Sequence, residues 1–245
     1  MTGIRAVCFD LDGTLLRDDH VDGVVRAVAA QLAQRYPGVD ADALAAANER
    51  VWWDYWPEVG DAWLAGLIAP DAVPTEVWRR ALSEVGVTDA AASPLASALH
   101  TEIEAVSFRL YEESAEVLRA LRANGIRLAL ITNGPSALQR AKLRATGIEG
   151  AFDVVIVSGE HGIHKPDPAI FAMALAGLGV SAEEALHVGD NLVADIDGAR
   201  GAGLLPVWID RGGGGVEPDD RASTAVAGLR ELYPLVGVDL APQRG

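Results

Sequence analysis

Residues 4–15 read Ile-Arg-Ala-Val-Cys-Phe-Asp-Leu-Asp-Gly-Thr-Leu, a mainly apolar run that ends in two carboxylates, Asp10 and Asp12. The run has the length of a buried strand, and Gly13 marks the turn into a loop. In open α/β sheets the carboxyl ends of the strands face the ligand crevice. Two acids this close are costly to bury unless a cation or a proton separates their charges. The stretch therefore predicts a site at a strand end that holds a hard divalent metal.

Short apolar runs alternate with amphipathic stretches between residues 127 and 209. The apolar runs predict buried strands at 128–132, 153–157, 185–188 and 205–209. The amphipathic stretches predict helices at 136–146, 168–178 and 193–202, each of which is followed by a glycine. Strands that alternate with helices of this length predict an α/β fold with a doubly wound parallel sheet.

The segment from 18 to 108 differs from the rest because it is rich in alanine and contains no convincing strand. Helical periodicity predicts helices around 24–36, 43–52 and 74–85, which form an insertion between the first two core strands. Four of the six tryptophans lie between 52 and 63, where we expect them mainly to pack helices together. A helix at 113–124 returns the chain to the core. The expected units are an α/β core at 1–17 and 109–235, a helical cap at 18–108 and a tail at 236–245.

The composition excludes several classes of function. The chain has 245 residues, of which 50% are hydrophobic, so it is long enough for a sizeable core. A net charge of −15 argues against nucleic-acid binding, which needs clustered basic residues. No stretch of signal-peptide or membrane-span length is found, so we expect a soluble, cytoplasmic protein with no membrane partner. Residues 211–221, with four successive glycines, are expected to form a surface loop.

Four short motifs fall at predicted strand ends or in the loops beside them. Together they supply acids, a hydroxyl, backbone amides and a lysine to one crevice, which is the equipment for phosphoryl transfer. Lys165 is informative because only two of the twenty Lys and Arg residues are lysines, so a lysine is unlikely to fall in a motif by chance. The motifs are Asp10-Leu-Asp12-Gly-Thr14, Thr132-Asn133-Gly134, His164-Lys165-Pro-Asp and Gly189-Asp190-Asn-Leu-Val-Ala-Asp195.

With these four motifs in this order, the chain resembles the haloacid dehalogenase superfamily, in the subfamily whose helical cap is inserted after the first core strand. The resemblance implies a Rossmann-like core and an Mg²⁺-dependent phosphatase that works through an aspartyl-phosphate. Asp10 would be the nucleophile, and Asp12 would protonate the leaving alcohol and then activate water. Mg²⁺ would be held by Asp10, the backbone carbonyl of Asp12 and Asp190, with Asp195 in an outer role.

The remaining motif residues would bind the phosphoryl group. Thr132 offers a hydroxyl, and the amides of Asn133 and Gly134 offer a cradle at the start of a helix. Lys165 would neutralise charge on the phosphoryl oxygens and on Asp10. Each of these residues also has an ordinary structural interpretation, as a turn, a strand end or a helix-start charge. The functional interpretation depends on all four motifs occurring together.

Several alternatives differ in what they require of the chain. An acid at position 12 favours phosphate esters over halides, and the absence of lysine from 18–108 argues against a phosphonatase that forms an imine. A phosphomutase shares the core motifs and stays open, as do a phospho-acceptor signalling module and an inactive scaffold. The histidines lack the spacing of a zinc site, and His187 is expected to be a hydrogen-bonded core residue. The expected substrate is a small phosphorylated metabolite, and the protein is expected to be a monomer or homodimer.

Overall fold

The strand Ala6–Phe9 (β1) lies at the middle of a six-stranded sheet, between β2 and β4. The computed structural model describes residues 3–212 and 221–238. The strand order is β3-β2-β1-β4-β5-β6 and every pairing is parallel, which confirms the predicted doubly wound sheet. The edge strand β6 was not predicted. The other strands are β2 (Arg127–Thr132), β3 (Val154–Val157), β4 (Ala185–Gly189), β5 (Leu205–Ile209) and β6 (Thr224–Val226).

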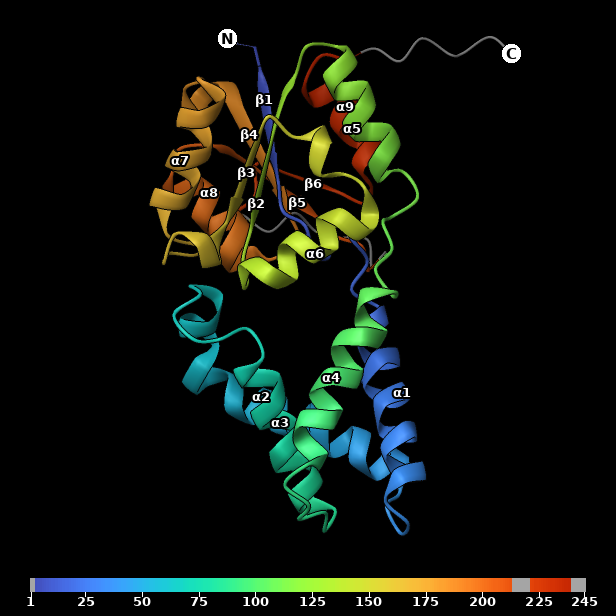
Figure 1. The fold of residues 1–245 in the computed structure, drawn as a ribbon. Helices are drawn as coiled ribbons and strands as arrows, with labels where there is room; N and C mark the ends of the chain where they lie inside the picture. Colours follow the sequence, from blue (N-terminus) through green and yellow to red (C-terminus); the bar gives the residue numbers. More distant parts are fainter. Residues whose placement is uncertain (1–2, 213–220, 239–245) are drawn as a thin grey trace, which may run out of the picture.

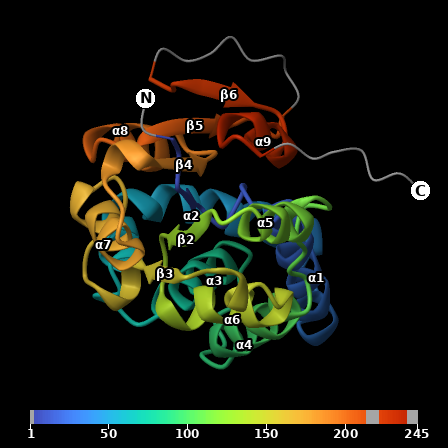
Figure 2. The ribbon, with the colours of Figure 1, turned by 90° about the horizontal axis from the view of Figure 1, so that it is seen from above.

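Helices cover both faces of this sheet, as Figure 2 shows along the strand direction. Successive side chains of β1 point to opposite faces, so Val7 and Phe9 join one core and Ala6 and Cys8 join the other. The first core includes residues of α5, α6 and α9, and the second includes residues of α7 and α8. These helices are α5 (Ser114–Ala123), α6 (Ser136–Thr146), α7 (Pro168–Leu178), α8 (Gly198–Gly201) and α9 (Leu232–Leu235).

The segment 18–108 folds into four long helices with a hydrophobic core of their own. Figure 1 shows these helices on the side of the sheet where β1 ends. The second helix is much longer than predicted, because it continues through Pro57. Trp52 and Trp56 stack with ring centroids 5.3 Å apart, in line with the predicted packing role, whereas the side chain of Trp53 is exposed. The four helices are α1 (His20–Arg35), α2 (Ala41–Leu64), α3 (Ala72–Glu84) and α4 (Ala92–Ala105).

The helical insertion contacts the core at the two segments that connect it to the core and also at separate places. Those connections lie side by side, with the Arg17 amide donating to the Arg109 carbonyl at 2.9 Å. At a separate place the Ser158 hydroxyl, just after β3, donates to the Leu64 carbonyl at the end of α2, at 2.5 Å. Helix α4 also contacts α6. The carboxyl ends of the strands therefore face the helices of the insertion.

Two predicted segments differ in detail. The helix predicted at 193–202 is a π-helix at Leu192–Asp197 followed by the short α8, and its first amides are capped by the Asn191 side chain. Val236 and Val238 are buried in the core, so the packed chain extends past the predicted boundary at 235. Most of the predicted loop 211–221 and of the tail lies outside the described residues. Within the described residues, every helix is too short or too polar to cross a bilayer.

Candidate active site

Three carboxylates meet where the two central strands end. Asp10 follows β1, Asp190 follows β4, and Asp195 lies in the π-helix beyond it. One oxygen of each lies within 4.8 Å of one oxygen of the others. The two strands pair directly, and the Asp10 amide donates to the Val188 carbonyl at 2.9 Å. Sequence motifs almost 180 residues apart therefore form one acidic group, here called the strand-end cluster.

Glycines make this close approach sterically possible. A Cβ on Gly13, whose φ is 75°, would lie 2.5 Å from Oδ2 of Asp190. A Cβ on Gly189 would lie 2.2 Å from Cγ of Asp195, which is less than any real contact distance. The two motifs therefore need glycine at these positions so that the carboxylates can pack against the backbone.

Lys165 joins two of the three acids. Its Nζ lies 2.6 Å from an oxygen of Asp10 and 2.6 Å from an oxygen of Asp195, and the residue is only 3% exposed. The Asn133 side chain fixes the backbone of Lys165 by donating to its carbonyl at 2.9 Å and accepting from its amide at 2.8 Å. The structure thus brings together these four residues, which the sequence singled out. Asn133 contributes through its side chain, a contact that the sequence analysis did not predict.

Asp195 is engaged on both of its oxygens. Besides Lys165, it accepts from His187 Nε2 at 2.9 Å and from the Asn191 amide at 3.1 Å. His187 is fully buried in β4, so it is the hydrogen-bonded core histidine that was predicted. Asp195 therefore accepts three hydrogen bonds, whereas Asp10 accepts one from Lys165 and Asp190 accepts one from Thr14, so Asp10 and Asp190 have more oxygen lone pairs available for a ligand. Asp190 accepts from the Thr14 hydroxyl at 3.3 Å.

The pKa values of the cluster follow from burial and from its neighbours. Burial raises the pKa of Asp190 to about 6, and the Asp195 carboxylate adds to this shift. Burial also raises the pKa of Asp10, although Lys165 opposes it. Burial would raise the pKa of Asp195 as well, but Lys165 and His187 outweigh it and lower the value to about 2. Three carboxylates share one lysine, so a bound cation would relieve the remaining repulsion.

The Asp12 carboxylate belongs to a different group. Lys142 Nζ donates to both of its oxygens, at 2.9 and 2.8 Å, and Gln139 Nε2 donates to Oδ2 at 3.0 Å. Burial would raise the pKa of Asp12, but Lys142 and Gln139, with a contribution from His20, lower it. Both lysines of the chain therefore lie in this site. Sequence reasoning missed Lys142 and Gln139; the rarity of lysine and their spacing of three along one helix were the available signal.

The residues that were expected to bind phosphate lie at the end of β2 and directly after it. Thr132 lies at the end of β2, is 1% exposed, and accepts from the Gln139 side chain through its hydroxyl. The Gly134 amide, which was expected to face phosphate, donates instead to the Ser158 hydroxyl at 2.8 Å. A donor that already has a buried partner is not free for a ligand, so the expectation for Gly134 is corrected in this respect.

Comparison with known proteins supports this geometry. The family model for haloacid dehalogenase-like hydrolases matches residues 4–203. A phosphoserine phosphatase of Thermus thermophilus is 36% identical, over 94% of this chain and 98% of that protein. A solved HAD phosphatase from Thermococcus onnurineus is 27% identical, with a TM-score of 0.70, and covers 97% of this chain and all of that one. A 2-haloacid dehalogenase from Pseudomonas syringae is 26% identical, with a TM-score of 0.69, over 96% and 98% of the two chains.

The sheet topology, the strand-end cluster and these matches agree on the class of protein. The chain belongs to the haloacid dehalogenase-like hydrolases. It is accordingly an enzyme of the hydrolase class.

Proposed function

We propose that this hydrolase is an Mg²⁺-dependent phosphatase that cleaves small phosphate monoesters through phosphorylated Asp10. The observation that carries the proposal is the buried Asp10 carboxylate, held 2.6 Å from Lys165 and next to Asp190 and Asp195. The 36% identity to a phosphoserine phosphatase favours a phosphate ester over a halide as the substrate. We further propose that 18–108 acts as a cap domain over the site, which favours a compact substrate.

The residues of the strand-end cluster fit a divalent cation. Carboxylate oxygens are hard ligands of the kind that Mg²⁺ prefers, and their mutual repulsion needs a counter-charge. Asp10 and Asp190 would hold the ion, together with the Asp12 carbonyl, while Asp195 would orient Lys165. When bound, the ion would neutralise phosphoryl charge and help to align the ester with Asp10.

The reaction proceeds in two displacements at phosphorus. An Asp10 oxygen forms a bond to phosphorus while the ester P–O bond breaks, and Asp12, which must be protonated in the substrate complex, gives that proton to the departing alkoxide oxygen. A water molecule then attacks phosphorus, its proton returns to Asp12, and the bond to Asp10 breaks. Lys165 balances negative charge at the phosphoryl group in both steps. Thr132 and the Asn133 amide would contact the phosphoryl oxygens.

Release of phosphate from p-nitrophenyl phosphate tests this proposal. The purified protein with Mg²⁺ should turn over many times, excess EDTA should stop turnover, and Mg²⁺ should restore it. Asp10→Asn should abolish turnover while circular dichroism stays unchanged, because the side chains are nearly isosteric. A single phosphorylation without turnover would identify a phospho-acceptor module instead. Transfer of phosphate between positions of a sugar phosphate, without release, would identify a phosphomutase.

A further inference from the structure

The backbone of Asp190 is held by a tryptophan of the neighbouring strand. Trp208 of β5 pairs with Gly189, the last residue of β4, and its indole Nε1 donates to the Asp190 carbonyl at 2.9 Å. Asp190 and Asn191 lie between the end of β4 and the start of the π-helix at Leu192. Neither the strand ladder nor the helix therefore fixes the peptide group between these two residues, and the indole supplies a hydrogen bond there.

The same peptide group is also held on its opposite edge. The Asn191 amide, which belongs to this group, donates to Asp195 Oδ2 at 3.1 Å, and the peptide is trans. In a trans peptide the carbonyl and the N–H point in opposite directions. Asp195 Oδ1 accepts from Lys165 and His187. A chain of hydrogen bonds thus runs from the Trp208 indole through one backbone peptide to Asp195 and on to Lys165.

Packing does not hold Asp190 from every side. The residue is partly exposed and lines a cavity of about 200 Å³, together with Trp208 and Gly13. At about 30 Å³ for each water, this cavity of about 200 Å³ has room for about six waters. Without the indole N–H, the Asp190 carbonyl is free to turn toward this space and to bond to water. Such a rotation also turns the Asn191 amide away from Asp195, so both carboxylates lose their alignment.

We propose that Trp208 is a positioning residue for the divalent cation site of the strand-end cluster. Its indole N–H fixes the peptide between residues 190 and 191, so that Asp190 keeps the orientation in which it binds the ion and Asp195 stays directed at Lys165. Groups that orient metal ligands by hydrogen bonds typically contribute about 10- to 100-fold to metal affinity. This inference depends on the proposed function, because it requires that the cluster binds Mg²⁺.

Metal binding to the purified protein without substrate tests this role. The probe is Mn²⁺, which favours the same oxygen ligands as Mg²⁺ and whose free concentration is read from its electron paramagnetic resonance signal. Trp208→Phe keeps an aromatic ring beside Gly189 and removes the N–H, so the Mn²⁺ dissociation constant should rise by about tenfold or more. Trp63→Phe is the matched control, because the Trp63 indole also donates to a backbone carbonyl at 2.9 Å, that of Pro70 in the insertion. The control should leave the dissociation constant unchanged.

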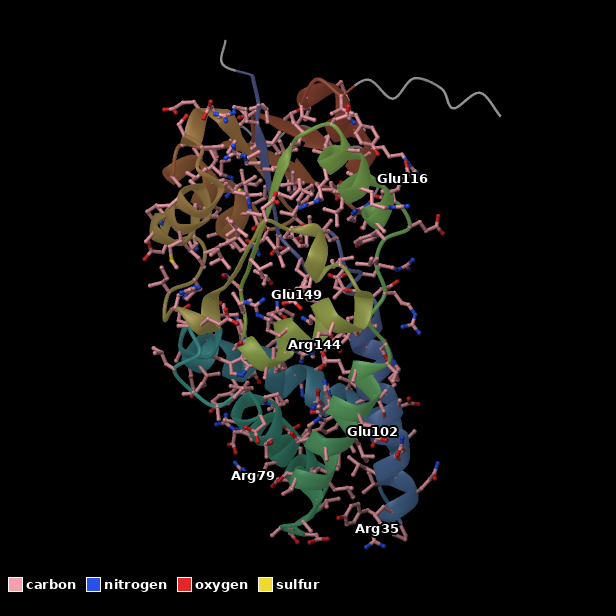
Figure 3. All side chains as sticks on the ribbon, turned by 45° about the horizontal axis from the view of Figure 1, so that its top comes forward. Arg35, Arg79, Glu102, Glu116, Arg144 and Glu149 are labelled. Atoms are coloured by element: carbon pink, nitrogen blue, oxygen red, sulfur yellow. The ribbon has the colours of Figure 1, made fainter. Side chains whose placement is uncertain are left out.

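A further control concerns binding of the ion to the protein surface. The chain has a net charge of −15, so exposed carboxylates also attract Mn²⁺. Glu102→Gln removes one exposed carboxylate, on α4 (Figure 3), and should leave the measured constant unchanged. A changed constant would mean that surface carboxylates, and not the strand-end cluster, bind the measured ion, which would overturn the assignment.

A second measurement uses the wild-type protein and does not depend on the folding of a variant. Linkage between two binding events is reciprocal, so if the indole hydrogen bond strengthens metal binding, the bound metal must strengthen the indole hydrogen bond by the same factor. Saturating Mg²⁺ should therefore slow hydrogen exchange of the Trp208 indole N–H, followed by NMR, by about tenfold or more. Exchange of the Trp63 indole N–H should stay unchanged.

Several results would overturn the role of Trp208. One is an unchanged Mn²⁺ dissociation constant in folded Trp208→Phe, and another is indole exchange that Mg²⁺ slows equally at Trp208 and Trp63. Equal weakening of Mn²⁺ binding in Trp208→Phe and Trp63→Phe would also do so, because a general loss of stability would then explain both. A wild-type protein that binds no Mn²⁺ would instead contradict the proposed metal-dependent function, so the two failures are distinguishable.

Discussion

The strand-end cluster and the Asp12 group, in which Lys142 and Gln139 donate to the Asp12 carboxylate, are built in different ways. In the cluster, strands and glycines fix the carboxylates, and Asp195 is saturated with donors. In the Asp12 group, the contacts run from side chains of helix α6 to the loop that follows β1. The difference indicates that the sheet and its glycines fix the strand-end cluster, whereas the surroundings of Asp12 depend on how α6 packs against the end of β1.

The largest effect is expected when Asp12 is replaced by Asn, because this change removes the acidic group that distinguishes the Asp12 group from the strand-end cluster. If Asp12 is the acid, kcat/KM for an alkyl phosphate should fall by about 10²- to 10³-fold, because an alkoxide leaves poorly without a proton. For p-nitrophenyl phosphate the loss should stay below about tenfold, since p-nitrophenolate needs no proton to leave. Asp42→Asn, at an exposed carboxylate of the insertion, is the control and should change neither rate. Equal losses for both esters would remove Asp12 from the role of acid.

The same contrast explains how much the sequence could predict. Strand positions and the motifs at their ends followed from local patterns, because a buried parallel strand has a distinctive apolar run. The pairing of Lys142 with Asp12 could not be predicted from a local pattern, because it depends on how α6 is rotated against the end of β1. The pairing of the Gly134 amide with Ser158 likewise depends on two loops that are distant in the sequence. The edge strand β6 has only three residues, too few for a periodic pattern.

A second test concerns the rigidity of the strand-end cluster. In Gly189→Ala the new Cβ would overlap the Asp195 carboxyl group, so Asp195 must move away from Lys165 and His187. We expect the free energy of unfolding to fall by about 3 kcal/mol, as for severe overpacking. Gly201→Ala, where nothing lies within 4 Å, should instead be neutral or gain up to about 1 kcal/mol. Urea unfolding measures both, and a tolerated Gly189→Ala would show that the cluster is adaptable.

The contact between core and insertion at Ser158 should have a smaller effect. Ser158→Ala removes the acceptor of the buried Gly134 amide and the donor to Leu64. An unsatisfied buried amide should lower the free energy of unfolding by about 1–2 kcal/mol. Ser136→Ala breaks an exposed hydrogen bond to Glu160 and should cost less than about 0.5 kcal/mol. Equal unfolding free energies for the two variants would show that the Ser158 contact stabilises neither side.

The smallest effect is expected on the outer surface of the insertion. Hydrogen bonds from Arg79 and Arg80, against the opposing effect of burial, lower the pKa of Glu76 from 4.5 to about 2. A carboxyl group whose pKa is depressed by folding stabilises the protein above its unfolded pKa, and this contribution is lost as the pH falls through the folded value. Glu76→Gln should therefore be less stable than the wild type at neutral pH, and by no more than about 1 kcal/mol because the pair is partly exposed.

The difference in unfolding free energy should shrink as the pH falls from about 4.5 toward about 2, where the wild-type carboxyl group also becomes neutral. Guanidinium chloride would screen the ion pairs, so urea unfolding over this pH range is the appropriate measurement. Phosphatase activity should not change, because Glu76 pairs with arginines of its own helix and contacts no residue of the site. A pH-independent difference would mean that Glu76 acts through packing and not through its charge.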